Sequence, residues 1–332
     1  MTSVRLRLLI LALLPLAVLM PLLLLVAINR WSANYDNLLI TNVASDLRIA
    51  DQYLQRLLTS TGSEVTSLAR SLRFDEVART SPADLPAFLE ENRRALGLDF
   101  LYFMPQHEAR KRSADWPVID TALRGQPATE IDIFTPGDLL SLPQTGVTLA
   151  NRARVPLVAT VAAQPTSRQT EDRGMVVHSA TPVTAIGAQG VLVGGLLLNR
   201  NLDFIDTINT LVYRDTGTTG DRQGTATLFL EDVRVSTNVR LFEGERALGT
   251  RVSAAVRATV LDKGQTWLDS AFVVNDWYIS AYRPLTDSFG KRVGMLYVGF
   301  LQAPFDAAKR RAYLLVLAAF LVVLAVSAPL FL

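Results

Sequence analysis

Two long stretches without a charged side chain, one near each end, constrain this 332-residue chain more than any other feature. They cover residues 8–28 and 312–332. About 20 apolar residues in an α-helix suffice to cross a hydrocarbon core roughly 30 Å thick. The sequence therefore predicts a transmembrane helix at each of these two positions.

The flanking charges predict an orientation for these helices. Arg5 and Arg7 favour a cytoplasmic N-terminus at 1–7, which places 29–311 outside the cytoplasm. Lys309, Arg310 and Arg311 oppose this orientation because they precede the second span on its outer side. A cleaved signal peptide is the alternative for 8–28, but the apolar run is longer than a usual signal core and no small-residue cleavage site follows. We expect the chain to be the front part of a longer receptor.

Composition excludes several classes of protein. The formal net charge is only +2, and Arg5 and Arg7 account for it, so the region between the spans lacks the basic footprint of a nucleic-acid binder. The chain has no Cys and two His, which argues against disulfides, zinc sites and Ser-His-Asp chemistry. Without a phosphate-binding or dinucleotide motif either, we expect no catalytic residue, metal or cofactor within 1–332.

Helical periodicity follows the first span. Between 29 and 73, apolar or small residues recur at steps of three and four, as in Leu39, Val43, Leu47 and Ala50. This spacing predicts one long amphipathic helix continuous with the first span. The helix would serve as a spacer from the bilayer, as a signalling lever, or as both.

An imperfect internal repeat predicts two related modules in tandem. Residues 176–198 and 278–299 share a pattern of strand, turn and strand. The matching positions are Pro182 with Pro284, Gly190 with Gly290, and Gly194 with Gly294. Each unit is expected to end in an antiparallel hairpin. Strand alternation places His178 on the face that corresponds to that of Tyr278 and Tyr282.

These features together resemble a known family of sensors. The runs that carry the resemblance are 190–201, 227–239, 249–252, 277–285 and 293–299. They are similar to the extracellular Cache sensors of bacterial receptors, of the tandem type that fuses Cache 3 and Cache 2. The Arg-x-Trp-Tyr run that marks amino-acid binding in some tandem members is not present in this sequence.

The resemblance implies an α+β fold with two PAS-like Cache modules, each an antiparallel sheet cupped by helices, on a long N-terminal helix flanked by two transmembrane helices. Small ligands of such sensors bind in a pocket on one sheet face, commonly in the membrane-distal module. The predicted organisation is a cytoplasmic end at 1–7, a span at 8–28, the long helix at 29–73, the distal module at 74–213, a linker at 214–224, the proximal module at 225–302, and a helix with the second span at 303–332.

The resemblance also implies a function. Sensors of this type serve histidine kinases, chemoreceptors or cyclic-dinucleotide enzymes, and the first span with its long helix favours a two-component sensor histidine kinase. The implied protein is a homodimer in the bacterial inner membrane, with lipid, a small ligand such as a carboxylate and a cytoplasmic response regulator as partners. An envelope adaptor that binds another protein without a small ligand is the alternative.

Candidate ligand-binding residues combine cationic, aromatic and hydrogen-bonding side chains. A bidentate Arg–carboxylate contact is the reason to examine the loop that follows the first predicted strand. The candidates in the distal module are Tyr102, Arg110, Arg112, Asp115, Trp116 and His178. Weaker candidates in the proximal module are Arg234, Thr237, Arg251, Tyr278 and Tyr282.

Overall fold

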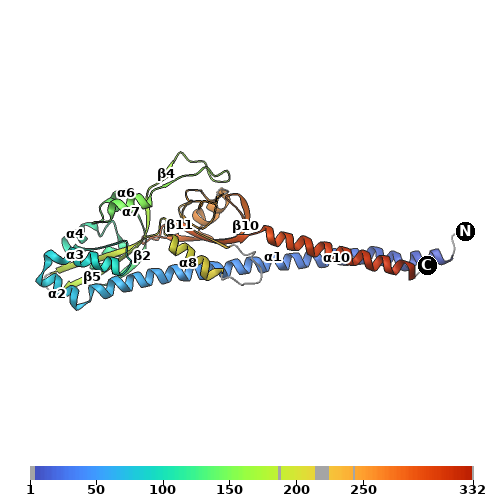
Figure 1. The fold of residues 1–332 in the computed structure, drawn as a ribbon, viewed down its shortest axis with the longest axis horizontal. Coiled ribbons are helices and arrows are strands. Elements are labelled where there is room, and N and C mark those ends of the chain that lie inside the picture. The colour runs from blue at the N-terminus through green and yellow to red at the C-terminus, as the bar shows by residue number, and fades with distance from the viewer. Residues whose placement is uncertain (1–3, 186–187, 214–223, 242–243, 331–332) are drawn as a thin grey trace.

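A computed structural model describes residues 4–185, 188–213, 224–241 and 244–330 of the chain. The molecule is elongated, with two sheet domains side by side on one long helix and a helical stalk at one end (Figure 1). Helix α1 (Val4–Ala69) runs through the stalk and beneath both sheets, and α10 (Ala303–Leu330) returns along it. Both ends of the chain therefore lie at the far end of the stalk.

Helix α1 packs against one face of the sheet in both domains. Its buried side chains follow the predicted spacing, with Val43, Ala50 and Leu54 fully buried. They belong to one core cluster that also contains side chains from both sheets, such as Val177 and Ile279. Burial of one helical face against two sheets explains how a helix of this length is held straight along the domains.

The distal domain is built on a four-stranded antiparallel sheet of order β1-β6-β5-β2. Helix α1 packs on one face, and the short helices α4, α5 and α7 pack on the other. Helices α2 and α3 complete the far end. The strands are β1 (Phe100–Pro105), β2 (Ala128–Phe134), β5 (Gly174–Ala185) and β6 (Ala188–Leu197). The helices are α2 (Leu72–Thr80), α3 (Leu85–Ala95), α4 (Gln106–Arg112), α5 (Pro117–Leu123), α6 (Pro136–Leu140) and α7 (Gly146–Ala153), with a 3-10 turn at Pro82–Asp84.

The proximal domain is built on a five-stranded antiparallel sheet of order β8-β7-β11-β10-β9. Helix α8 (Leu202–Val212) leads into it along α1. A short helix α9 (Ala254–Arg257) continues as a π turn (Ala258–Asp262) over the face opposite α1. The strands are β7 (Gly224–Leu230), β8 (Val233–Thr237), β9 (Trp267–Val273), β10 (Asp276–Thr286) and β11 (Arg292–Leu301).

Both hairpins of the internal repeat form. Strand β5 pairs antiparallel with β6, and β10 pairs antiparallel with β11. The faces also correspond: Val177 and Ile279 point to α1, whereas His178 and Tyr282 lie on the opposite face of their sheets. The α+β fold with a long N-terminal helix and antiparallel sheets is thus confirmed.

Between the two sheets, a strap rises from the distal domain and lies against the proximal one (Figure 1). It begins and ends at a small two-stranded sheet, β3 (Val155–Pro156) with β4 (Thr170–Glu171). Backbone bonds fasten it to the proximal domain, from Val158 N to Gly249 O and from Ala254 N to Ala162 O. This contact between distant segments has no periodic signal in the sequence.

The structure differs from the sequence prediction at two points, and a third prediction lies mostly outside the described residues. Helix α1 ends at Ala69 rather than residue 73, because the Ser71 hydroxyl accepts a bond from Phe74 N and starts α2. The linker predicted at 214–224 lies outside the described residues, except that Gly224 begins β7. Among the residues that the structure describes, no helix has the length and apolarity needed to cross a membrane, which does not support the spans predicted at 8–28 and 312–332.

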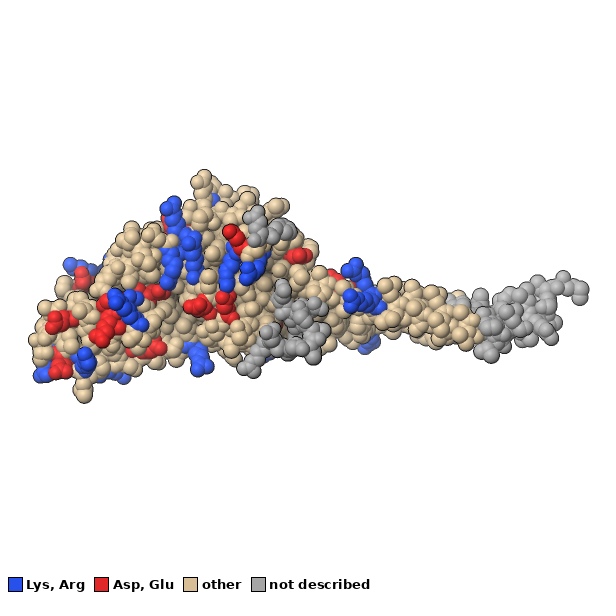
Figure 2. All heavy atoms as spheres, viewed as in Figure 1, with Lys and Arg blue, Asp and Glu red and all other residues tan. Residues whose placement is uncertain are grey.

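Charged side chains of both signs are interspersed over the sheet domains on the face shown in Figure 2. Most of the part of the stalk that is not drawn in grey carries none in this view. Arg310 and Arg311 near the start of α10 are exposed. On this face, blue side chains gather over the upper middle of the sheet domains and red side chains lie directly below them.

Candidate functional site

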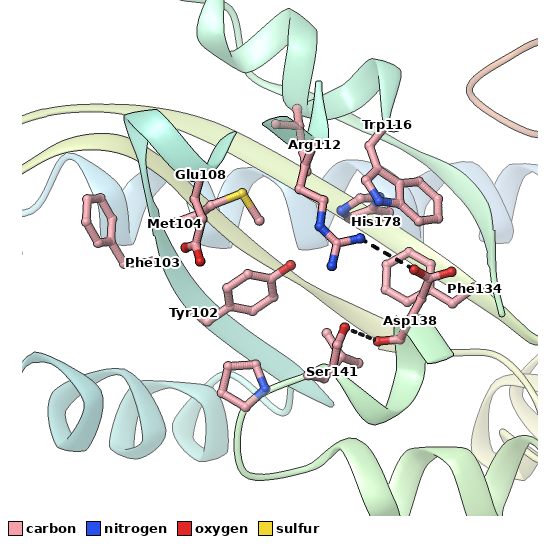
Figure 3. A pocket seen from close by; sticks show the side chains of 13 residues that line it. Tyr102, Phe103, Met104, Glu108, Arg112, Trp116, Phe134, Asp138, Ser141 and His178 are labelled. Carbon is pink, nitrogen blue, oxygen red and sulfur yellow. Dashed lines mark hydrogen bonds and ion pairs between the residues drawn. The ribbon is translucent and has the colours of Figure 1, made fainter. Parts of the chain in front are cut away.

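A cavity of about 230 Å³ lies on the face of the distal sheet that points away from α1. Strands β1, β2 and β5 form its floor, and α4, α5 and the segment from α6 to Pro143 form its walls (Figure 3). The lining residues are Tyr102, Phe103, Met104, Glu108, Arg112, Trp116, Ile119, Phe134, Asp138, Ser141, Leu142, Pro143 and His178. Apolar walls with a few polar groups are typical of small-molecule sites.

Capping interactions at the start of α6 position Asp138, an acid in the cavity wall. Asp138 sits at the third position of α6 and forms a capping box with Thr135, whose backbone N and Oγ1 donate to Asp138 Oδ2 at 3.0 and 2.6 Å. These bonds occupy one carboxylate oxygen and leave Oδ1 directed toward Arg112, at 3.7 Å from Nη1. The acid is therefore held by its own helix, not by the arginine.

Arg112 is the cation of the cavity. It ends α4 and its side chain points inward, with 43% of its surface still accessible. A separation of 3.7 Å from Asp138 is too long for a hydrogen bond, so the guanidinium keeps donors for another partner. A planar fork of this kind binds a carboxylate in a bidentate manner.

Tyr102 adds a neutral donor from β1. Burial raises the pKa of Tyr102 to about 12, and the nearby positive charge of Arg112 opposes this rise. The phenol therefore keeps its proton over the physiological range and can donate to an anion beside Arg112. Figure 3 shows its hydroxyl directed toward the same space as the guanidinium.

His178 lies on β5 among aromatic rings. The imidazole meets Trp116 and Phe134 edge-on, with centroid distances of 5.3 and 5.1 Å. Its Nδ1 is 2.8 Å from Asp132 Oδ2, and both side chains are 1% exposed. The ring is therefore fixed by packing on its edges and by one buried carboxylate.

The structure brings four of the six distal candidates together. Tyr102, Arg112, Trp116 and His178 all line the cavity. Arg110 and Asp115 are exposed and do not line it. Glu108, Phe134, Asp138 and Ser141 were not among the candidates. Of these, only Asp138 has a sequence signal, the Thr-Pro-Gly-Asp pattern of a capping box.

Among the proximal candidates, Arg234 lies close to Tyr278 and Tyr282, and four of the five have structural contacts. Arg234 is buried, donates from Nη1 to Thr250 Oγ1 at 3.0 Å, and lies 5.0 Å from the centre of the Phe229 ring. Burial lowers the pKa of its guanidinium, whereas surrounding tyrosines, Tyr282 first, oppose that fall. Thr237 shares a hydrogen bond of 2.6 Å with Thr227 inside the sheet.

Arg251 fastens the strap. It pairs with Asp232 at 2.6 Å, and its Nη1 donates to Gln164 O in the strap. Tyr282 is buried against Tyr297, with ring centroids 4.6 Å apart. Tyr278 is half-buried and lines a wider hollow of about 840 Å³ on the proximal domain. Tyr278 and Arg251 thus line two different hollows, whereas four distal candidates line one cavity.

No group of three His, Asp or Glu side chains suited to a metal ion occurs in the described part of the chain. The polar groups that line the distal cavity are one arginine, one phenol, one imidazole, one indole and one hydroxyl, together with the acids Glu108 and Asp138. This arrangement suits non-covalent binding of a small polar molecule.

Residues 196–312 match the family model described as single Cache domain 3. The match covers the proximal sheet domain, the helix α8 before it and the first part of α10. A search of curated proteins found no match.

Several solved sensor domains are similar to this chain. The periplasmic domain of Vibrio cholerae LuxQ has 12% identity and a TM-score of 0.41, over 78% of this chain and 99% of that one. The sensor domain of the V. cholerae histidine kinase DctB has 12% identity and a TM-score of 0.39, over 80% and 98%. The sensory domain of the Campylobacter jejuni chemoreceptor Tlp3, with isoleucine bound, has 10% identity and a TM-score of 0.37, over 82% and 95%.

Proposed function

We propose that the chain is the ligand-sensing region of a bacterial receptor and that the distal cavity binds a small carboxylate. The observation that carries this proposal is Arg112, an arginine that lines a partly open cavity and whose nearest acid stands at 3.7 Å and is held by its own helix cap. A ligand carboxylate can take up the free guanidinium donors and the Tyr102 hydroxyl without breaking that cap.

The match to single Cache domain 3 supports the sensory class for the proximal half of the chain. The repeat of hairpins and of sheet faces supports the proposal that the distal domain is a second module of the same kind. In this proposal the distal module binds the ligand, and the proximal module passes its effect to α10.

The receptor that we propose is a homodimeric sensor histidine kinase of the inner membrane, anchored by 8–28 and 312–332, with a response regulator as its cytoplasmic partner. The uncharged ends of the chain and their position in one stalk support the anchoring. ATP-dependent autophosphorylation of the whole receptor that changes with an added acid would support the kinase output. Ligand-dependent methylation or cyclic-dinucleotide synthesis would indicate the chemoreceptor or cyclase alternatives instead.

Thermal unfolding of the chain with a panel of acids tests the ligand proposal. We expect at least one of acetate, isovalerate, 2-hydroxyisovalerate and succinate to raise the unfolding temperature. Arg112→Gln should abolish that shift, because the neutral amide cannot replace a bidentate guanidinium. Arg110→Gln is the matched control: it removes the same charge from the same helix, but outside the cavity, and should keep the shift. Equal shifts in both variants would refute the proposal.

A further inference from the structure

One ring nitrogen of His178 has a hydrogen-bond partner among the described residues, and the other has none. Nδ1 lies 2.8 Å from Asp132 Oδ2, whereas the buried Nε2 has no hydrogen-bond partner among the described residues. The imidazole lines the cavity, so a molecule bound there is the available partner for Nε2. A buried polar atom without a partner is costly to a fold, and each such atom calls for an explanation.

The partner of Nδ1 determines what Nε2 can do. An ionised carboxylate only accepts hydrogen bonds, so Nδ1 carries the proton of the bond to Asp132. In a neutral imidazole, Nε2 then has a free lone pair and is an acceptor. With an ionised Asp132 and a neutral imidazole, the cavity offers an acceptor at His178 in addition to the donors of Arg112 and Tyr102.

Asp132 is itself held by the other domain. Its Oδ1 accepts from Ser288 Oγ at 2.6 Å and from Ser288 N at 3.3 Å. Ser288 lies in the turn between β10 and β11, and its backbone N is also 3.2 Å from Ile131 O on β2. A chain of hydrogen bonds thus runs from the distal cavity through β2 to the hairpin of the proximal sheet.

On the basis of the proposed carboxylate site, we propose that Asp132 and Ser288 are positioning residues that hold His178 Nε2 as an acceptor in the cavity. The ligand is then a carboxylate that carries a hydrogen-bond donor, a hydroxyl or an ammonium group. The carboxylate meets Arg112 and Tyr102, and the donor meets His178. Asp132 is hydrogen-bonded to both His178 and Ser288. A ligand bound to His178 is therefore connected through Asp132 to the turn between β10 and β11.

NMR spectra of the histidine ring nitrogens test, without any ligand, whether Asp132 fixes the proton of His178 on Nδ1. The full chain, labelled with ¹⁵N in its histidine rings and held in detergent micelles, contains only His107 and His178, and His107→Gln assigns the signals. We expect His178 to have a protonated Nδ1 and a bare Nε2. Asp132→Asn should move the proton to Nε2, because an amide can donate to Nδ1. Glu91→Gln, which removes an exposed carboxylate from α3 of the same domain, should change nothing. A bare Nδ1, or an imidazolium, in the unmutated chain would overturn the proposal.

A pair of acids that differ in one hydroxyl tests the ligand class. Calorimetry with 2-hydroxyisovalerate and isovalerate should show at least about tenfold tighter binding of the hydroxy acid, because isovalerate leaves Nε2 unpaired. In Asp132→Asn the protonated Nε2 can still donate to a hydroxyl oxygen, so this variant is tested with valine, whose ammonium group only donates. Its preference for valine over isovalerate should fall below about threefold. Equal affinities for the hydroxy acid and isovalerate in the unmutated chain, or a preference for valine that Asp132→Asn leaves intact, would overturn the proposal.

Ser288→Ala tests the link between the domains. It should lower the affinity for the hydroxy acid about threefold and leave that for isovalerate unchanged. Glu231→Gln is the control, since it weakens another contact between the domains, the ion pairs with Arg168 and Arg173. Equal effects of both variants would overturn the role of Ser288. Binding of neither acid would instead refute the carboxylate site and its ligand class, while the ring spectra still decide the positioning.

Discussion

At the residue scale, the cavity combines donors that are held in different ways. Arg112 ends a short helix and remains partly accessible, whereas Tyr102 stands on a strand inside the domain. The strand holds the phenol in place before a ligand binds. The hydrogen bond from Tyr102 to a ligand therefore costs little side-chain conformational entropy. The arginine must lose side-chain freedom on binding, and its two-point contact offsets that loss.

Removal of the Tyr102 hydroxyl should weaken binding without harming the fold. Tyr102→Phe keeps the ring and loses one donor to the carboxylate, so we expect about a fivefold to tenfold higher Kd for 2-hydroxyisovalerate. Calorimetry measures the affinity, and urea unfolding checks that stability changes by less than about 1 kcal/mol. An unchanged Kd would show that the phenol does not reach the ligand.

Buried tyrosines predict a loss of stability in alkali. Burial raises the pKa of both Tyr102 and Tyr282 to about 12. A phenol with a raised pKa stabilises the fold while it is protonated, so its contribution is complete below pH 10 and is lost as the pH rises toward 12. The urea midpoint should fall between pH 10 and pH 12, and less steeply in Tyr102→Phe, which cannot ionise there. Parallel falls in both proteins would contradict this assignment.

Sequence reasoning found some site residues better than others for physical reasons. His178 could be placed on its face because strand alternation has a period of two and the repeat fixed its phase. The sequence could not predict which residues near Arg112 point into the cavity. Helix α4 is short, and the position of its first residue determines which side chains point inward. Asp138 was missed because its position depends on a tertiary fold of α6 over the sheet.

At the element scale, the β5–β6 hairpin depends on close backbone approach. A Cβ added to Gly195 would lie 1.8 Å from Val177 O and 2.7 Å from the Phe100 ring. Both neighbours are core groups of the same sheet and have little room to move. The strand order therefore requires glycine at this position.

Gly195→Ala should destabilise the distal domain by about 2 kcal/mol or more, because the added methyl overpacks a well-packed core. Gly137→Ala is the control, since its nearest neighbour is the Thr135 hydroxyl at 3.7 Å. Urea unfolding followed by circular dichroism measures both. A Gly195→Ala variant as stable as Gly137→Ala would contradict the packing described for β5 and β6.

Elements with strong periodicity could be predicted from sequence, and irregular contacts could not. The long helix and both hairpins have regular apolar patterns over many residues, which determine their type. The strap between β3 and β4 has no such pattern, because it is held by hydrogen bonds to Gly249 O and Arg251 N, which lie far away in the sequence. The early end of α1 at Ala69 depends on a single cap, Ser71.

At the scale of the whole molecule, the two domains share a floor and several bridges. Helix α1 packs under both sheets, and strand β11 leads through Gln302 into α10. Within the stalk, Tyr35 of α1 contacts Phe305 of α10, with ring centroids 6.5 Å apart, and Asp36 pairs with Lys309. A shift of the β10–β11 hairpin therefore has a short physical path to the stalk.

Hydrogen–deuterium exchange of the full chain with and without saturating 2-hydroxyisovalerate tests most directly whether the distal cavity is the sensing site. The account predicts slower exchange in α4, in α6 and its following loop, and in the turn that contains Ser288, with little change around Tyr278. Protection confined to the proximal sheet, with the distal cavity unchanged, would contradict it.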